Sequence, residues 1–471
     1  MRKALFVVLG LLVPVTAGAQ PQPAAPEPSP GPSITLPPPP AVSDPMLAPV
    51  PPPKSVITSW EQVLADLRAR STDLRQAVDQ VLVAEAATRI ALAAYLPHLD
   101  GAAGNGSAGA YTHQLLTNSV QNPNIPGLPP TTTIPAPNVF SGSMTLSQVL
   151  IDVPMWDQIS INELGEDAAH LSVEAEKRVL ALSVANQIVA VVTAERSAEI
   201  NRVGLRVALE QVEIASRKRA LGAATGLDVV RAQQNAANAR ASLVTGDESL
   251  RESREALGLA LGRPEEVGVG HDVNINGLAD GTLSSCRVVN NVDQRSDIAQ
   301  ARVNLEVAKR NLRNEWYQFI PTVGVQTTLS GTSIPNTGYP NPTWSISGVL
   351  QIPIFDGGVR YGTIYNLRAQ EDIAAQQLEA LRRQAVIQVQ QAQRQLLVAE
   401  ESYRVAKEQR DLAAQNDQMT QTAYMTGQGT SLELVTASEA HRQAELNLAL
   451  QEFGVVKARI LAVLALATCP W

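Results

Sequence analysis

Residues 219–233 read Arg219-Ala-Leu-Gly222-Ala-Ala-Thr225-Gly-Leu227-Asp228-Val-Val-Arg-Ala-Gln233, and this stretch combines the end of one helix with the start of another. Gly222 can adopt the left-handed conformation that closes a helix. Thr225 suits the N-cap of the next helix, and Asp228 follows three residues later, as a capping box requires. Leu227 resumes an apolar face. The stretch therefore predicts a tight turn between two antiparallel helices.

The same pattern returns at Tyr424-Met-Thr-Gly427-Gln-Gly-Thr430-Ser-Leu432-Glu433-Leu-Val-Thr-Ala-Ser438. Gly427, Thr430, Leu432 and Glu433 each lie 205 positions after their counterparts in the first stretch. Any two packed helices need such a turn, so one copy is weak evidence. Two copies in register predict the paired tips of two long helical hairpins.

The rest of the chain also falls into two halves. Helical shaft segments are predicted at 57–95 and 296–318, and they align without a gap at a shift of 224, with Pro97 against Pro321. After each proline the pattern changes to the alternation of apolar and small polar residues that is typical of strands. These strand regions span 96–157 and 319–358. The four strands are predicted at 99–110, 139–150, 323–329 and 343–352, with exposed loops at 121–138 and 333–342.

Two unbroken helical segments follow the strands, at about 158–221 and 359–426. At ~1.5 Å per residue, each would extend on the order of 95 Å, which is far longer than a globular helix. With the returning helices at 227–261 and 431–467, they form the predicted hairpins. The predicted hairpin domains are 158–261 and 359–467, with an equatorial segment at 262–295 and a C-terminal end at 468–471.

The N-terminus has the features of a secretory signal. Arg2-Lys3 precedes an apolar run, and Ala17-Gly18-Ala19 supplies small residues at the end of it. We therefore expect a signal peptide at 1–19. Residues 20–56 are dominated by proline and predict an extended, solvated linker.

Composition excludes several classes of function. The net charge is −8, and basic residues are scattered among acidic ones, so no nucleic-acid partner is expected. After the signal, no run reaches the 18 or so apolar residues of a transmembrane helix. No Walker loop, Gly-x-Ser-x-Gly or His-Glu-x-x-His motif is present, so we expect no enzyme and no cofactor. The isolated histidines indicate solvated or packed side chains and not a metal site. They are His98, His113, His170, His271 and His441.

Four strands per chain cannot stand alone in lipid, because an open sheet exposes unpaired backbone groups at its edges. Bacterial barrels have at least eight strands, so two copies would give a narrow filled barrel and three would give twelve strands with a lumen. We favour three. Aromatic residues in or beside the strands support interface girdles, although they could also pack where strands meet helices. They are Tyr95, Tyr111, Phe140, Trp156, Trp316, Tyr317, Phe319, Trp344 and Phe355.

The signal, the doubled order of helix, strand, strand, long helix, tip and helix, and the two tip sequences resemble the TolC family of outer-membrane efflux proteins. The resemblance covers about 57–467. It implies a homotrimer whose 12-stranded β-barrel lies in outer-membrane lipid of a Gram-negative bacterium, continuous with a coiled-coil α-helical tunnel in the periplasm. It also implies that the tips meet an inner-membrane pump through a periplasmic adaptor (membrane fusion) protein. The protein would be the passive exit duct of a tripartite efflux or type I secretion system.

The resemblance also places a constriction on the second long helix, a few turns before the tip. Asp417 lies ten residues before Gly427, and Asp411 is a second candidate. Three copies of Asp417 would form an acidic ring that attracts cations. Alternatively, Asp417 faces solvent or pairs with a neighbouring helix.

The same fold brings the equatorial segment near the C-terminal end. Because the periplasm is oxidising, a disulfide between Cys286 and Cys469 is one expectation. Two unpaired thiols are the other.

A structural or adhesive coiled-coil surface protein without transport activity is the alternative function. It accounts for the long helices but not for two-faced strands that interrupt them twice. The sequence does not identify the cargo.

Overall fold

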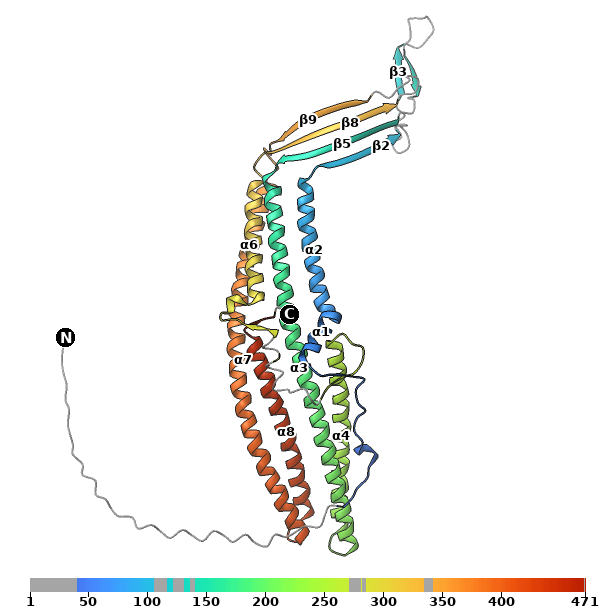
Figure 1. Ribbon diagram of the computed structural model, residues 1–471, viewed down its shortest axis with the longest axis vertical. Helices are drawn as coiled ribbons and strands as arrows, with labels where there is room; N and C mark the ends of the chain where they lie inside the picture. Colours follow the sequence, from blue (N-terminus) through green and yellow to red (C-terminus); the bar gives the residue numbers. More distant parts are fainter. Residues whose placement is uncertain are drawn as a thin grey trace, which may run out of the picture. The chain divides into compact units, whose positions relative to one another are not determined.

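Two pairs of long helices run side by side in the computed structural model (Figure 1). α3 (Val153–Ala220) and α7 (Val359–Thr426) have 68 residues each. α4 (Gly226–Ala260) packs along α3, and α8 (Ser431–Leu464) packs along α7. Because α3 also contacts α8, the two hairpins lie against each other.

The structure describes residues 40–105, 117–121, 131–135, 140–270, 281, 285–333, 342–469 and 471. The predicted signal peptide at 1–19 lies outside the described residues, as does the linker up to residue 39.

Shorter helices extend each repeat beyond its hairpin. α1 (Trp60–Arg70) leads into α2 (Thr72–Tyr95), which packs on α3. α6 (Ser296–Tyr317) packs on both α3 and α7. The starts of α2 and α6 differ by 224 positions (296 − 72), the same shift as in the sequence repeat.

One antiparallel sheet draws strands from both repeats, in the order β2-β5-β8-β9. β2 (His98–Asn105) pairs with β5 (Phe140–Ile151). β8 (Thr322–Ser333) pairs with β9 (Thr343–Gln351), and β5 pairs with β8 to join the halves. The mixed helix and strand fold predicted from the sequence is confirmed, and β2 and β9 are the edges of the sheet.

A separate hairpin lies where the sequence suggested a loop. β3 (Thr117–Gln121) pairs antiparallel with β4 (Thr131–Pro135), so the interpretation of 121–138 as loop is wrong for β4. The run Thr131-Thr-Thr-Ile134 is β-branched, which favours strand despite the prolines around it. The rest of that predicted loop, and 334–341 in the second predicted loop, lie outside the described residues.

The largest buried cluster surrounds the middle of α3, in a region that we call the collar. Two small sheets line it: β1 (Ser55–Ile57) with β6 (Val267–Val269), and β7 (Arg287–Val288) with β10 (Ala467–Thr468). Its fully buried side chains include Val63, Leu67, Val184, Ile188, Leu257, Leu261, Ile460 and Leu464. Burying one Leu or Ile side chain contributes about 1.5–3 kcal/mol, so the collar is the main source of apolar stabilisation within one chain. Short 3-10 helices lie at Pro45–Leu47 and Val292–Gln294.

Residues 40–57 contact the helices, which corrects the interpretation of this stretch as solvated linker. Asp44 forms an ion pair with Arg240 of α4 at 2.8 Å. Arg254, also on α4, donates a hydrogen bond to the carbonyl oxygen of Pro51 at 3.0 Å. A proline-rich segment is already restricted in the unfolded chain, so it loses little entropy when it lies along a helix pair.

One described helix, α3, contains an 18-residue window that is long and apolar enough to cross a membrane by composition. Within the protein, 39% of that window is buried. A helix packed in a core passes the same test, and the middle of α3 forms part of the collar.

Cys286 and Cys469 form a disulfide across the collar, between positions 183 residues apart in the sequence. Both are almost completely buried. Replacing both with Ser should lower the free energy of unfolding by about 2–4 kcal/mol, because the unfolded chain regains loop entropy. Thermal unfolding with and without reductant measures this loss.

Single Cys286→Ser and Cys469→Ser variants serve as controls, and each should expose one alkylatable thiol. Equal gel mobility with and without reductant, together with two alkylatable thiols in unreduced wild-type protein, would contradict the pairing.

Candidate functional site

The first tip connects α3 to α4 through the predicted capping box. Gly222 has φ of 74° and lies just after the end of α3. The backbone N–H of Ala223 donates to the carbonyl of Lys218 at 2.8 Å, which closes the last turn. Asp228 Oδ2 accepts from the Thr225 backbone N–H at 2.8 Å, and Thr225 Oγ1 accepts from the Asp228 N–H at 3.3 Å.

The second tip connects α7 to α8 by the same devices. Gly427 has φ of 83° and forms the C-cap of α7. Glu433 Oε2 accepts from the Thr430 N–H at 2.8 Å, and Thr430 Oγ1 accepts from the Glu433 N–H at 3.3 Å. A longer Glu in place of Asp therefore closes an equivalent box.

The two tips contact each other through side chains. Ser431 Oγ donates to Asp228 Oδ1, so the cap of the first tip is shared with the second. Lys218 Nζ donates to the backbone carbonyl of Tyr424 and lies 3.9 Å from the centroid of the Tyr424 ring. Contacts from each hairpin to the other thus fix the relative position of the tips within one chain.

These contacts change the pKa values of the groups involved. The hydrogen bond from Ser431, then those from Thr225, hold the pKa of Asp228 below its usual value. Hydrogen bonds from Thr430 lower the pKa of Glu433 in the same way. A carboxyl with a lowered pKa stabilises the fold above its unfolded-state pKa, and this contribution is lost as the pH falls through the folded-state value. Protonation of Asp228 and Glu433 in acid therefore removes the contribution of these two carboxylates to the stability of the tips.

Two leucines project from the tips into solvent. Leu227 is 56% exposed and Leu432 is 50% exposed. Each is the second residue of its helix, directly after the N-cap and N1. Exposed apolar side chains at matched positions of two rigid turns offer a surface that another helical protein could bury.

The candidate gate residues both have partners within the chain. Asp417 Oδ2 lies 3.0 Å from His441 Nδ1 of α8, and His441 Nε2 lies 3.7 Å from Glu445. Asp417 thus pairs with a neighbouring helix, the alternative that the sequence left open. Asp411 is half-exposed and forms an ion pair with Arg410 at 3.1 Å.

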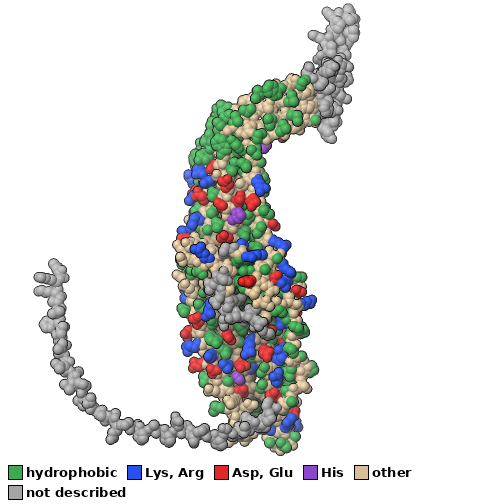
Figure 2. Space-filling view, viewed as in Figure 1, with side chains coloured by type: hydrophobic (Ala, Val, Ile, Leu, Met, Phe, Trp, Pro, Cys, Tyr) green, Lys and Arg blue, Asp and Glu red, His purple; other side chains and the backbone are tan. Residues whose placement is uncertain are grey.

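The sheet has one apolar face. Met144, Leu329 and Trp344 lie side by side across β5, β8 and β9, and all three are exposed, Trp344 by 70%. β5, β8 and β9 contain no Asp, Glu, Lys or Arg. Figure 2 shows hydrophobic side chains gathered over the sheet and charged side chains over the helices. An exposed apolar face of this kind is typical of contact with lipid.

The other face of the sheet carries small polar side chains. Ser143, Ser330 and Thr343 form the row next to the apolar one. Ser330 and Thr343 share a hydrogen bond of 2.7 Å between their hydroxyl groups. This face suits contact with water.

Several predicted girdle aromatics pack against one another where strands meet helices. Tyr95 and Trp156 have ring centroids 6.2 Å apart. Phe319 lies 5.9 Å from Trp316 and 5.7 Å from Tyr361. These aromatic residues therefore pack where the strands meet the helices, which is the alternative that the sequence left open.

The remaining girdle candidates differ in exposure. Trp344 and Phe355 are exposed, and Tyr317 is half-buried. Tyr111 and the side chain of Phe140 lie outside the described residues.

Sequence reasoning missed contacts that depend on tertiary packing. It treated His441 and His170 as isolated, but His441 contacts Asp417, and His170 lies close to Glu85 and Glu166. The spacing of four residues between Glu166 and His170 on one helix was the available signal. His113 and His271 lie outside the described residues.

Comparison with known proteins identifies relatives by sequence and by structure. The chain is 25% identical over 424 residues to nodulation protein T of Rhizobium leguminosarum bv. trifolii, covering 85% of this chain and 83% of the relative. It is 25% identical over 323 residues to the pyoverdine export outer membrane protein OpmQ of Pseudomonas aeruginosa, covering 66% and 63%. The CmeC outer membrane channel of Campylobacter jejuni superposes with a TM-score of 0.70 at 16% identity, covering 92% of this chain and 94% of that chain.

A family model for outer membrane efflux proteins matches residues 63–263 and 290–460. The match includes both tips and the four strands of the sheet. It spans well over half of the 471 residues. The chain therefore belongs to the outer membrane efflux protein family.

Proposed function

We propose that three copies of this chain form an outer-membrane exit duct, in a tripartite efflux or type I secretion system. The observation that carries the proposal is the junction of an open, two-faced sheet with two long helical hairpins in one chain. The sheet supplies a lipid-spanning wall, and the hairpins extend from it into the periplasm. Family membership supports an efflux channel in the outer membrane.

The open edges of the sheet support oligomerisation. β2 and β9 end the strand order, so each has one side without a described partner strand. In lipid, those backbone groups need hydrogen bonds from strands of other copies. Three copies supply twelve strands, with the apolar row facing lipid and the Ser/Thr row facing a water-filled lumen.

The tips support docking to a periplasmic adaptor that connects the duct to an inner-membrane pump. Two capped turns held together by the Ser431–Asp228 hydrogen bond present Leu227 and Leu432 from a rigid base. Rigid exposed apolar anchors are efficient in binding, because little conformational entropy is lost on contact. The duct itself is passive, so the choice of cargo belongs to the pump.

The proposed barrel predicts opposite results for neighbouring residues of β9. Ile346→Lys places a charge on the apolar face, where it should cost about 2–4 kcal/mol near the bilayer midplane and prevent assembly. Ser347→Lys places the same charge on the polar face and should be tolerated.

Wild-type protein extracted from outer membranes should have the mass of three chains by analytical ultracentrifugation.

A stable monomer that stays in the periplasm without detergent would contradict the trimeric barrel. Equal insertion of the Ile346→Lys and Ser347→Lys variants would contradict the assignment of the two faces.

The tips predict a loss of export without a loss of folding. Leu227→Asp and Leu432→Asp should each weaken adaptor binding by about 2 kcal/mol or more, roughly 30-fold, while barrel insertion persists. Thr225→Ala should cost only about 1 kcal/mol of helix stability and leave export near normal. Export assays in cells, with adaptor binding measured on purified protein, test both outcomes.

Leu259→Asp is the matched control, because Leu259 is 80% exposed at the opposite end of α4. Normal export by both tip variants would show that the tips are not part of the docking surface.

The acidic candidates predict changes in ion selectivity. If Asp417 lines the narrow part of the tunnel, Asp417→Ala should reduce cation selectivity and weaken block by multivalent cations in bilayer recordings. Asp411→Ala tests the second candidate, farther from the tip. His441→Ala breaks the contact with Asp417 but keeps its charge, so selectivity should be retained.

Unchanged selectivity and block in Asp417→Ala would place this aspartate outside the pore. If both Asp417→Ala and Asp411→Ala leave selectivity and block unchanged, neither aspartate lines the narrow part of the tunnel.

A further inference from the structure

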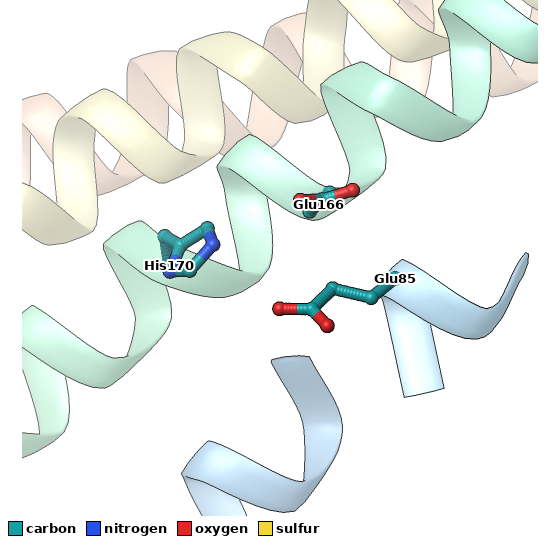
Figure 3. Close-up of side chains that lie close together, drawn as sticks. All are labelled: Glu85, Glu166 and His170. Carbon is teal, nitrogen blue, oxygen red and sulfur yellow. The ribbon is translucent and has the colours of Figure 1, made fainter. Parts of the chain in front are cut away.

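Three potential metal ligands lie together in the first repeat, away from the tips and the sheet. Figure 3 shows Glu85 reaching from α2 toward Glu166 and His170, which lie along α3. One ligand atom of each residue lies within 4.8 Å of the others. The two glutamates are half-buried and His170 is exposed, so the group is open to ions from solvent.

Local structure fixes the positions of these residues. Glu166 and His170 are four positions apart on α3, so they share one face of the helix. Thr88 of α2 donates a hydrogen bond to Glu166 Oε2 at 3.3 Å. Asn162 Nδ2 of α3 donates to the carbonyl of Ala87 at 3.4 Å, one turn before Glu166. These contacts hold α2 against α3 at the level of the group.

The charges of the two glutamates are not neutralised by a described side chain. Throughout the described part of the chain, no ion pair involves Glu85 or Glu166, although many other acidic residues have Arg partners. Two carboxylates at this separation repel each other. A divalent cation between them would turn that repulsion into attraction, and Thr88 would orient one of the two ligands, as outer partners do in metal sites.

The second repeat provides an internal comparison, because its corresponding helices keep only one of the three ligands: Glu166 corresponds to Asp372 (166 + 206). With the shift of 224 between α2 and α6, Glu85 corresponds to Lys309. With the shift of 206 between α3 and α7 (359 − 153), His170 corresponds to Gln376. Helix packing alone therefore does not require two acids and a histidine at this level.

We propose that Glu85, Glu166 and His170 bind one divalent transition-metal cation of the Zn²⁺ class and thereby link α2 to α3. The imidazole favours Zn²⁺, Ni²⁺ or Cu²⁺ over Mg²⁺ and Ca²⁺, and carboxylate oxygens complete a three-ligand set. Ligands around Zn²⁺ at bond lengths of about 2.0–2.2 Å lie about 3.3–3.6 Å apart. Rotations within the flexible Glu side chains would bring the three ligand atoms to that spacing. A water molecule would then occupy the fourth coordination position of the ion.

The position of the site gives the metal a mechanical role. α2 leads directly into β2, and α3 begins directly after β5, so the clamped helices carry the two paired strands of the first repeat. A cation that links α2 to α3 would stiffen this base. Cargo does not need to contact it, so the site is independent of the proposed efflux function.

The test uses purified full-length protein, treated with chelator and then titrated with ZnCl₂ by calorimetry. Wild-type protein should bind one Zn²⁺ per chain that Mg²⁺ does not displace. Glu85→Gln and His170→Ala should each weaken binding by at least about 10-fold, since loss of an outer partner alone costs 10–100-fold. At a Zn²⁺ concentration near the wild-type Kd, Zn²⁺ should raise the melting temperature of the wild type more than that of Glu85→Gln or His170→Ala, and it should slow amide hydrogen exchange in α2 of the wild type.

Glu163→Gln is the matched control, because it removes one carboxylate from an exposed position of the same helix and should leave Zn²⁺ binding unchanged. Equal Zn²⁺ affinity in the wild type and His170→Ala would overturn the site. Displacement of Zn²⁺ by equal concentrations of Mg²⁺ would overturn the class of metal. If a variant fails to fold, hydrogen exchange of the wild-type protein with and without Zn²⁺ tests the proposal instead. Equal exchange rates in α2 under the two conditions would show that Zn²⁺ does not link α2 to α3.

Discussion

The unpaired edges of the four-stranded sheet are the constraint on which the rest of the structure depends. β2 and β9 end the strand order, and the row of Met144, Leu329 and Trp344 is exposed. Water can form hydrogen bonds with the backbone groups at the two edges, but contact between water and the apolar face is unfavourable. Lipid favours the apolar face but leaves the backbone groups at the edges without hydrogen bonds. In the proposed trimer, strands from further copies would resolve this conflict. Because each strand pair is continuous with α2 and α3 or with α6 and α7, closing the sheet would also gather the helices around the same axis.

The chain separates three physical tasks along its length. The sheet has almost no charge, the collar contains the large buried side chains, and the tips depend on capping and short polar contacts. The long hairpins between collar and tips contain smaller clusters that include many alanines, such as Ala208, Ala236 and Ala239. Small side chains allow helices to approach closely but contribute little apolar area. Apolar stabilisation is therefore concentrated in the collar, whereas the tips are held by local polar contacts.

Features with a local cause could be predicted from the sequence, and features with a tertiary cause could not. Gly222, Thr225 and Asp228 act within one turn of chain, so their spacing alone predicts the tip. The contact of residues 40–57 with α4 was missed, because proline content reports chain stiffness and not what the chain lies on. The proximity of Glu85 to His170 was missed for the same reason, since it depends on which faces α2 and α3 present to each other.

The disulfide between Cys286 and Cys469 has a consequence for damage to the protein. The two cysteines bracket α6, β8, β9, α7 and α8, so the entire second repeat is a covalently closed ring. A protease that cuts one peptide bond anywhere in this ring releases no fragment. The nicked chain keeps its two ends joined at the collar and stays one molecule until the disulfide is reduced. One cut in the second repeat therefore leaves all of its helices and strands attached to the same molecule.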